Sequence, residues 1–323
     1  MRERANVRDV SQPGNTDRLN GVRNSRSPSE LASRSTKAGR RSTSRSISEE
    51  LRVRFEPSKQ KTMALLEDGL RYLSSLADPR VQGWPLVDSP FTVISVVAVY
   101  VSFVTTVGPH WMRDRKPYNL KPLIMAYNLA NVFCSAFFAV QFFRHTYFGG
   151  GYSWSCQTVD YSDSPNALAL TRLAWWYLLL KIADLLDTVF FVLTKKQSHV
   201  TVLHVAHHSM VVGTVWLVLK YACGGQNILT AAVNSCVHVI MYGYYFLSLL
   251  GPSVQKYLWW KRYITQIQLI QFVGLVVHAV MPLFVRCGFP LFFSWLCIGE
   301  CAFFFLMFFQ FYRKSYKKLV KDC

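Results

Sequence analysis

TVLHVAHHSMVVGTVWLVLKYA (residues 201–222) decides the fold, because it joins an apolar run to three histidines. About 20 consecutive apolar residues are enough for an α-helix to cross the hydrocarbon core of a bilayer. Ionisable side chains are costly there, and those that occur usually face the protein interior and serve a function. His204, His207 and His208 stand at positions i, i+3 and i+4, so they share one face of the predicted helix.

Similar apolar stretches recur along most of the chain. The sequence has 323 residues, of which 51% are hydrophobic and 15% aromatic. We therefore predict an all-α polytopic membrane protein with seven transmembrane helices. The stretches are 91–108, 124–144, 170–194, 202–222, 227–249, 262–285 and 290–312.

Between the predicted helices, the basic residues of the chain lie mainly in every second loop. The formal net charge is +18, and short basic loops alternate with loops that together hold a single arginine. Because basic loops stay in the cytosol, these loops and the C-terminus are predicted to be cytosolic and the N-terminus lumenal. Topology and the lipid bilayer account for the charge, so no nucleic-acid partner is expected. The basic loops are 113–116, 195–196, 261–262 and 313–318.

The two ends of the chain differ from the apolar body. Residues 1–62 form a basic tail rich in Ser and Arg, without apolar periodicity, which we expect to be disordered. The stretch 63–90 opens with MALLEDGLRYL and is predicted to be an amphipathic segment that precedes the membrane. Met63 is a candidate alternative start. Residues 91–312 hold the seven helices, and 313–323 form a basic cytosolic tail.

Charged residues recur inside the predicted helix 170–194. Lys181 and Asp184 are spaced i, i+3, close enough to pair and so to lower the cost of burial. Asp187 lies about 60° around the helix from Asp184. One interpretation is a purely structural ion pair. The other is a group that orients the histidines or receives a polar head group, in which Lys181, Asp184 and Asp187 contribute to substrate binding.

The next helices continue this polar pattern. Asn234 and His238 share one face of the stretch 227–249, where they could form an interhelical hydrogen bond. In the functional interpretation, His238 is a fourth imidazole that shares one chamber with His204, His207 and His208. The stretch 262–285 adds a stripe of glutamines. The candidate substrate-binding residues on these two helices are Asn234, Tyr242, Tyr245, Gln268 and Gln271.

The HxxHH pattern raises the question of a metal, because membrane desaturases and hydroxylases hold iron with several histidine boxes. The chain has eight histidines but no HxxxH and no second HxxHH, so we expect no metal. Imidazoles beside a Lys–Asp pair suit proton transfer, or attack on a thioester to give an acyl-imidazole. A metal-dependent lipid desaturase or hydroxylase and a seven-helix transporter remain the alternatives.

Four motifs lie in order on four successive predicted helices. KxxExxDT is Lys181–Thr188, HxxHH is His204–His208, NxxxHxxMYxYY is Asn234–Tyr245, and TxxQxxQ is Thr265–Gln271. On these motifs, residues 65–315 resemble the ELO/ELOVL family of very-long-chain fatty acid elongases, the 3-ketoacyl-CoA synthases of the endoplasmic reticulum. Asp184 stands where the family has Glu, which shortens that side chain by one methylene group.

The resemblance implies a reaction and a fold. A long-chain acyl-CoA and malonyl-CoA would give 3-ketoacyl-CoA, CoA and CO2, with no cofactor. Helices 2–7 of the seven would form a bundle around a narrow acyl tunnel. The histidines would lie between a cytosolic mouth for CoA and a closed acyl end. Expected partners are the two CoA substrates and the bilayer. Further possible partners stay open: the ketoreductase, dehydratase and enoyl reductase of the cycle, and a second copy of the chain.

Within this chemistry we assign roles to the four catalytic candidates. His207 is the first choice to carry the acyl group, although spacing does not separate it from His208. His238 would stabilise the enolate or move protons, and His204 and His208 would position or relay. A direct condensation, with histidine as general base, is the alternative to this acyl-histidine route.

Two further predictions concern location and cysteines. The resemblance places the chain in the membrane of the endoplasmic reticulum. Cys156 and Cys287 both fall in loops assigned to the non-cytosolic side, where an oxidising lumen allows them to pair, and the family topology supports this disulfide.

Overall fold

The computed structural model describes residues 61–65 and 67–316, and every regular element in that part of the chain is helical. The described residues fall into two units, divided after Leu73. Residues 61–65 and 67–73 of the first unit are helical. The predicted tails 1–62 and 313–323 lie outside the described residues except for 61–62 and 313–316.

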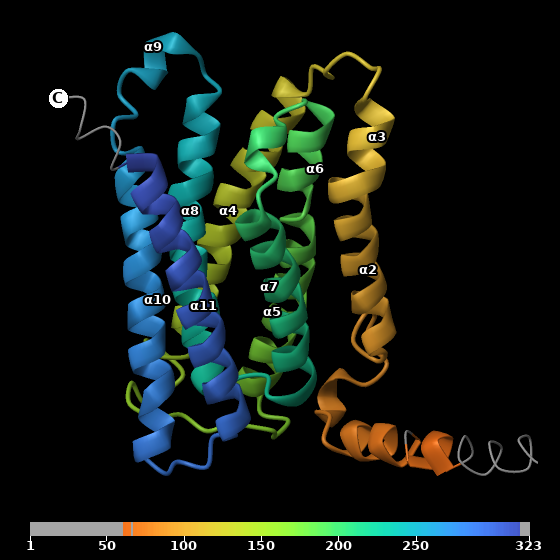
Figure 1. The fold of residues 1–323 in the computed structure, drawn as a ribbon. Coiled ribbons are helices and arrows are strands. Elements are labelled where there is room, and N and C mark those ends of the chain that lie inside the picture. The colour runs from red at the N-terminus through yellow and green to blue at the C-terminus, as the bar shows by residue number, and fades with distance from the viewer. Residues whose placement is uncertain (1–60, 66, 317–323) are drawn as a thin grey trace, which may run out of the picture. The chain divides into compact units, whose positions relative to one another are not determined.

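The second unit is built from long helices joined by short segments (Figure 1). Three of its helices begin at a Ser or Thr that accepts a backbone hydrogen bond, as helix caps do: Ser89, Ser164 and Thr201. The first long helix, Pro90–Met112, consists of α2 (Pro90–Ser102), the π-helical η2 (Phe103–Val107) and α3 (Gly108–Met112). It is followed by α4 (Lys121–His145), α5 (Pro165–Ala183), α6 (Leu186–Leu193), α7 (Val202–Tyr221), α8 (Ile228–Ser248), α10 (Lys261–Phe284) and α11 (Leu291–Tyr316). The short ones are η1 (Pro79–Val81), η3 (Gln197–His199), η4 (Gly225–Asn227) and α9 (Pro252–Gln255).

Five helices of the described chain are long and apolar enough to cross a membrane: Pro90–Met112, Lys121–His145, Val202–Tyr221, Lys261–Phe284 and Leu291–Tyr316. The protein is therefore an all-α multi-pass membrane protein, as predicted. The other two predicted stretches, 170–194 and 227–249, are helical as α5 with α6 and as α8. These helices carry many polar side chains, and the count of seven spans stays a prediction.

One predicted helix differs from expectation in its continuity. The stretch 170–194 is not a single helix, because the chain turns at Asp184 and Leu185 between α5 and α6. At this turn the Leu185 N–H donates to the carbonyl of Ile182, a tighter pattern than the α-helical one. The sequence pattern missed the turn because it contains no glycine or proline.

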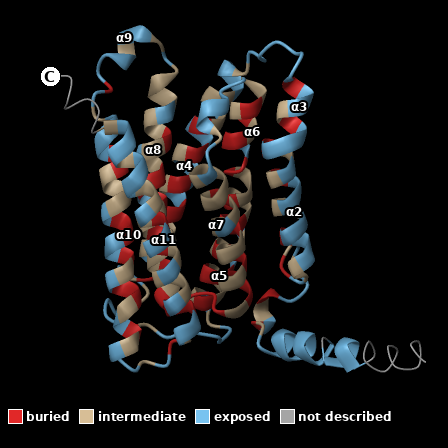
Figure 2. Ribbon diagram, viewed as in Figure 1, coloured by how far each residue is buried: buried red, intermediate tan, exposed pale blue. Residues whose placement is uncertain are grey.

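Helices α4, α5, α7, α8, α10 and α11 form a closed ring, in which each packs against its two neighbours. Going around the ring, α4 is followed by α5, α7, α11, α10 and α8, which returns to α4. Helix α2 packs on α7 from outside the ring, and α3 packs on α6. Buried residues lie toward the inside of this arrangement, whereas many outward residues are exposed apolar side chains, such as Phe133 and Ile270 (Figure 2). An apolar outer surface of this kind suits contact with lipid.

The two ends of the ring differ. We call the end that carries the loops 113–120, 194–201 and 249–260 the basic-loop end, since it holds the basic segments 113–116 and 195–196 (Figure 1). The opposite end, called the disulfide end, carries the loops 146–164, 222–227 and 285–290. Helix α7 begins at the basic-loop end, so HxxHH lies in that half of the ring.

Candidate functional site

The turn between α5 and α6 brings three charged side chains to one place. Lys181 lies in the last turn of α5, Asp184 is the residue that ends this helix, and Asp187 lies in the first turn of α6. All three are buried. The Lys181 Nζ lies 3.0 Å from Asp184 Oδ2, so the pair that the i, i+3 spacing predicted is formed.

His238 on α8 completes this group from the facing helix. Its Nδ1 lies 3.3 Å from Lys181 Nζ and 3.7 Å from Asp184 Oδ2. The Lys181 Nζ also lies 4.8 Å from the centre of the Tyr177 ring, and the Tyr177 hydroxyl donates to Asn234 Oδ1 at 2.9 Å. The ammonium group is therefore surrounded by a carboxylate, an imidazole nitrogen and an aromatic face, which offsets part of its cost of burial.

A second set of contacts lies behind this group. The Tyr242 hydroxyl lies 3.0 Å from Asp184 Oδ1 and 2.7 Å from Asp187 Oδ2. The Tyr127 hydroxyl, from α4, donates to the carbonyl of Ala183 at 3.2 Å and lies 3.5 Å from the Tyr242 hydroxyl. Side chains from α4, α5, α6 and α8 thus form one buried polar network.

The histidines of α7 face this network from another side. Thr201 caps the helix by accepting a hydrogen bond from the His204 N–H at 3.2 Å. The rings of His204 and His208 are 4.4 Å apart, and those of His207 and His208 are 5.5 Å apart. The His207 ring also packs edge-on against Phe304 of α11, with 4.9 Å between the ring centres. His207 is therefore held between a second imidazole and an apolar wall.

A small cavity joins the two groups. The residues that line it come from α5, α7 and α8 and from the turn after α5, and all but one are predicted site residues. They are Lys181, Asp184, His207, His208, Val211, Asn234 and His238. Two neighbouring imidazoles from α7 and one from α8 thus share a cavity with a buried ion pair.

The other predicted site residues lie outside that lining. His204 packs on Phe191 and His208. Tyr245 packs on Tyr242 and is 37% exposed. The remaining members of the predicted set are Asp187 and Tyr242, which lie behind the ion pair, and Gln268 and Gln271 on α10.

The two glutamines have different surroundings. Gln268 Nε2 lies 3.7 Å from the sulfur of Met241 on α8, and Gln271 is buried. Gln271 Oε1 has no hydrogen-bond partner among the described residues, and the same holds for His204 Nε2. Such groups are rare in folded proteins, so each is a candidate contact for a bound molecule.

Sequence reasoning missed two tyrosines of the network. Tyr177 stands four residues before Lys181 on the same face of α5, a spacing that could have indicated it. Tyr127 has no such local signal, because its contacts come from α5 and α8, which are distant in the sequence.

Among residues 61–65 and 67–316, no group of three or more His, Cys, Asp or Glu side chains is arranged to hold a metal ion. The assignment of no metal and no cofactor stays a prediction from the sequence.

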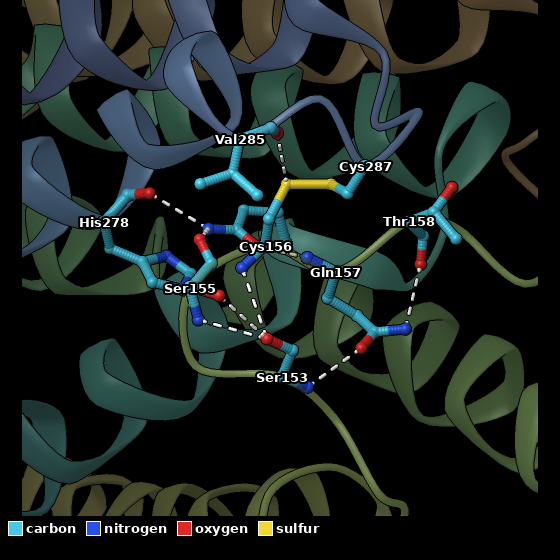
Figure 3. Close-up of a disulfide and its surroundings, with 9 residues drawn as sticks. Ser153, Ser155, Cys156, Gln157, Thr158, His278, Val285 and Cys287 are labelled. Carbon is cyan, nitrogen blue, oxygen red and sulfur yellow. Dashed lines mark hydrogen bonds between the residues drawn. A yellow bond between two sulfur atoms is a disulfide. The ribbon is translucent and has the colours of Figure 1, made fainter.

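The structure joins Cys156 and Cys287 in a disulfide, with 6.0 Å between the Cα atoms (Figure 3). Next to it, the buried Gln226 side chain accepts from the Gln157 N–H at 2.9 Å and donates to the carbonyl of His278 at 3.0 Å. These bonds tie the loop after α4 to the start of α8 and to the end of α10. The disulfide end of the ring is therefore covered by a cross-linked loop.

Comparisons with known proteins agree with the motifs. The family model described as "ELO: GNS1/SUR4 family" matches residues 85–322. The chain is 41% identical over 248 residues to very long chain fatty acid elongase 4 of Homo sapiens, covering 77% of this chain and 78% of that protein. It is 42% identical over 245 residues to very long chain fatty acid elongase 7 of Rattus norvegicus, covering 75% and 86%. For very long chain fatty acid elongase 7 of Drosophila melanogaster the identity is 38% over 261 residues, covering 79% and 78%.

Proposed function

The chain belongs to the ELO (GNS1/SUR4) family and acts in fatty acid elongation, and from this premise we propose that it is the condensing enzyme of the cycle. It joins a long-chain acyl-CoA to malonyl-CoA and yields 3-ketoacyl-CoA, CoA and CO2. The observation that supports this most directly is the shared cavity, where His207 and His208 of α7 face His238 and the Lys181–Asp184 pair. The family match also weighs against the desaturase and transporter alternatives.

The first stage of the proposed reaction is acyl transfer to a histidine. A ring nitrogen of His207 attacks the thioester carbonyl, the C–S bond breaks, and the ring proton leaves with CoA as the thiol. An acyl-imidazole is reactive enough to pass its acyl group on. The contact of His207 with Phe304 supports this choice, because it places an apolar side chain where an acyl chain would begin.

The second stage is the condensation. Malonyl-CoA loses CO2, and the electron pair left on its α-carbon forms a C–C bond to the acyl carbonyl carbon while the C–N bond to the imidazole breaks. Positive and polar groups that face the developing enolate lower the barrier. Lys181, which lies 3.3 Å from His238, supplies positive charge beside the imidazole that we assign to this role. A closed chamber also protects the acyl-imidazole from water.

We place the protein in the membrane of the endoplasmic reticulum, with its basic-loop end and C-terminus in the cytosol. The basic segments 113–116 and 195–196 support this orientation, because basic loops remain on the cytosolic side. CoA would then enter at the basic-loop end, near the histidines. The acyl chain would extend toward the disulfide end.

The test is an elongation assay on microsomes that express the protein, with labelled malonyl-CoA and a panel of acyl-CoAs. We expect a labelled 3-ketoacyl product with the wild type, none with His207→Ala, and a normal yield with His110→Ala, a histidine exposed on α3. Incubation with a labelled acyl-CoA alone, followed by mass spectrometry, should locate the acyl group on His207. A label on His208 would reassign the carrier, and no adduct at all would favour direct condensation.

A further inference from the structure

An unbroken series of polar contacts leads from α6 to the cavity. Asp187 Oδ2 lies 2.7 Å from the Tyr242 hydroxyl, which lies 3.0 Å from Asp184 Oδ1. The other oxygen of Asp184 lies 3.0 Å from Lys181 Nζ, and this nitrogen lies 3.3 Å from His238 Nδ1. Of the five residues, the first two lie outside the cavity lining and the last three form part of it. The function proposed above uses only those last three.

Counting hydrogens shows that this series holds an additional proton. A phenol carries one hydrogen, so the Tyr242 hydroxyl can donate to only one of the two carboxyl groups that it contacts. The second contact, at hydrogen-bond distance between two oxygens, requires a hydrogen on a carboxyl group. Asp184 is paired with Lys181, which leaves Asp187 as the carboxyl group that bears it.

The balance of charge leads to the same assignment. Lys181, Asp184 and Asp187 are all buried, at 2%, 1% and 8% exposure. With both carboxyl groups ionised, the network would carry an uncompensated negative charge, which is very costly away from water. One proton on Asp187 makes the network neutral. Tyr127 covers it on the side of α4, where its ring packs edge-on against Tyr242 and Phe190.

The proposed reaction needs a proton at one stage. When the acyl-imidazole gives up its acyl group, the electron pair of the broken C–N bond stays on the ring nitrogen, which must then be protonated. The negative charge comes from the malonyl carboxylate that left as CO2, so each turnover consumes one proton overall. The cavity itself contains no carboxyl group other than the ion-paired Asp184.

We infer that Asp187 is the proton donor for the condensation stage and that Tyr242, Asp184 and Lys181 relay its proton to His238. Asp187 gives its proton to the Tyr242 oxygen while Tyr242 gives its own to Asp184 Oδ1. Lys181 gives a proton to His238 Nδ1, and the protonated Asp184 carboxyl group turns to return one to Lys181 Nζ. His238 then protonates the departing imidazole from its other ring nitrogen, and water returns one proton to the network before the next turnover. This inference rests on the proposed function. Asp187 and Tyr242 act on the substrate only through His238, so they are relay residues without contact to the substrate.

The two stages can be measured separately on protein purified in detergent. CoA released from acyl-CoA alone reports the first stage, and labelled CO2 released after malonyl-CoA is added reports the second. Asp187→Asn keeps the shape of the side chain and can still donate to the Tyr242 oxygen, but it cannot give up a proton. We expect it to keep the first-stage rate within about 3-fold and to slow the second by about 100-fold, the scale of general acid catalysis. In the wild type, D2O should slow the second stage more than the first.

Two further variants make the result specific. Tyr242→Phe breaks the relay while both carboxyl groups remain, so it should reproduce the selective loss of the second stage. Tyr244→Phe removes a neighbouring hydroxyl on the same helix, where the ring packs against Tyr245 and Trp260, and should match the wild type in both stages.

The outcomes separate two kinds of failure. If Asp187→Asn condenses at the wild-type rate, or loses both stages equally, the relay is wrong and Asp187 is a structural residue. If the wild type forms no labelled product, the proposed function fails, whatever Asp187 does. If it forms product but no acyl adduct, condensation is direct, no acyl-imidazole departs, and the relay is wrong while the proposed function stands.

Discussion

The chamber and the disulfide end both bury polar side chains, but these side chains have different hydrogen-bond partners. We call the cavity and the buried polar network around Lys181, Asp184 and Tyr242 the chamber. In the chamber, side chains bond to side chains: Lys181 to Asp184, and Tyr242 to Asp184 and Asp187. At the disulfide end, the Gln226 side chain bonds to backbone groups of the loop after α4 and of helix α10. Side-chain networks can move protons and charge, whereas side-chain to backbone bonds fix the path of the chain. The difference fits our proposal that chemistry takes place among the side chains of the chamber, while the bonds at the disulfide end close the ring.

The same difference predicts how strongly a substitution in each region lowers the free energy of unfolding. A network of charged groups depends on every member, because the loss of one leaves another buried without a partner. At the disulfide end the groups that lose a partner are uncharged, so each removed bond costs less. The following four variants test this contrast on the free energy of unfolding, measured by chemical or thermal denaturation in detergent.

The largest effect is expected for Lys181→Met in the chamber. This change leaves the Asp184 carboxylate buried without its cation, a loss that costs about 3–5 kcal/mol. The double variant Lys181→Met/Asp184→Asn removes both charges and should recover a large part of that stability. Equal destabilisation of the single and double variants would show that the loss does not come from an unpaired Asp184 carboxylate. The contrast with the disulfide end would then disappear.

The next effect is expected at the disulfide. Cys156 and Cys287 are 131 residues apart in the sequence, so their bond restricts a long loop of the unfolded chain. Cys287→Ser should cost about 2–5 kcal/mol, and a reductant should lower the wild type to the same level. Cys134→Ser is the matched control, since Cys134 is a free, exposed thiol on α4. A reductant that leaves the wild type unchanged would contradict the prediction.

Much of this contrast could be predicted from the sequence. The apolar stretches predicted the five helices that are long and apolar enough to cross a membrane, and the spacing of Lys181 and Asp184 indicated their pair. The turn that separates α5 from α6 was not predictable, because helix-breaking residues are absent from it. The place of Tyr127 was equally hidden, since it depends on how α4 packs against distant helices. Local patterns therefore identified which helices hold polar groups, but not how those groups connect.

An intermediate effect is expected for Gln226→Leu at the disulfide end. Leucine keeps the approximate size of the side chain but leaves the Gln157 N–H and the His278 carbonyl without this partner. Buried polar groups that lose a partner cost about 1–3 kcal/mol. Gln255→Leu is the control, because Gln255 bonds to the Ser248 carbonyl in an exposed position on α9. If both variants lose the same stability, burial does not account for the effect at Gln226.

The smallest effect is expected at Asp160, in the loop that leads into α5. Hydrogen bonds from the Ser162 side chain and N–H hold the pKa of Asp160 below its ordinary value, and the Ser164 hydroxyl donates to it at 3.1 Å. A carboxyl group whose pKa is lowered by folding stabilises the protein above its unfolded pKa of about 3.9, and this contribution is lost as the pH falls below that value. Asp160 is exposed and screened by water, so Asp160→Asn should cost only about 0.5 kcal/mol at pH 7.

The pH dependence separates this effect from a general loosening of the loop. The difference between Asp160→Asn and the wild type should shrink as the pH is lowered from 7 to about 3, because the wild-type carboxyl group becomes neutral as well. A constant difference at every pH would mean that Asp160 acts through its shape. The charge of Asp160 would then contribute nothing to the free energy of unfolding. Of these groups near the two ends of α5, only the charged Lys181–Asp184 pair in its last turn would stabilise the protein.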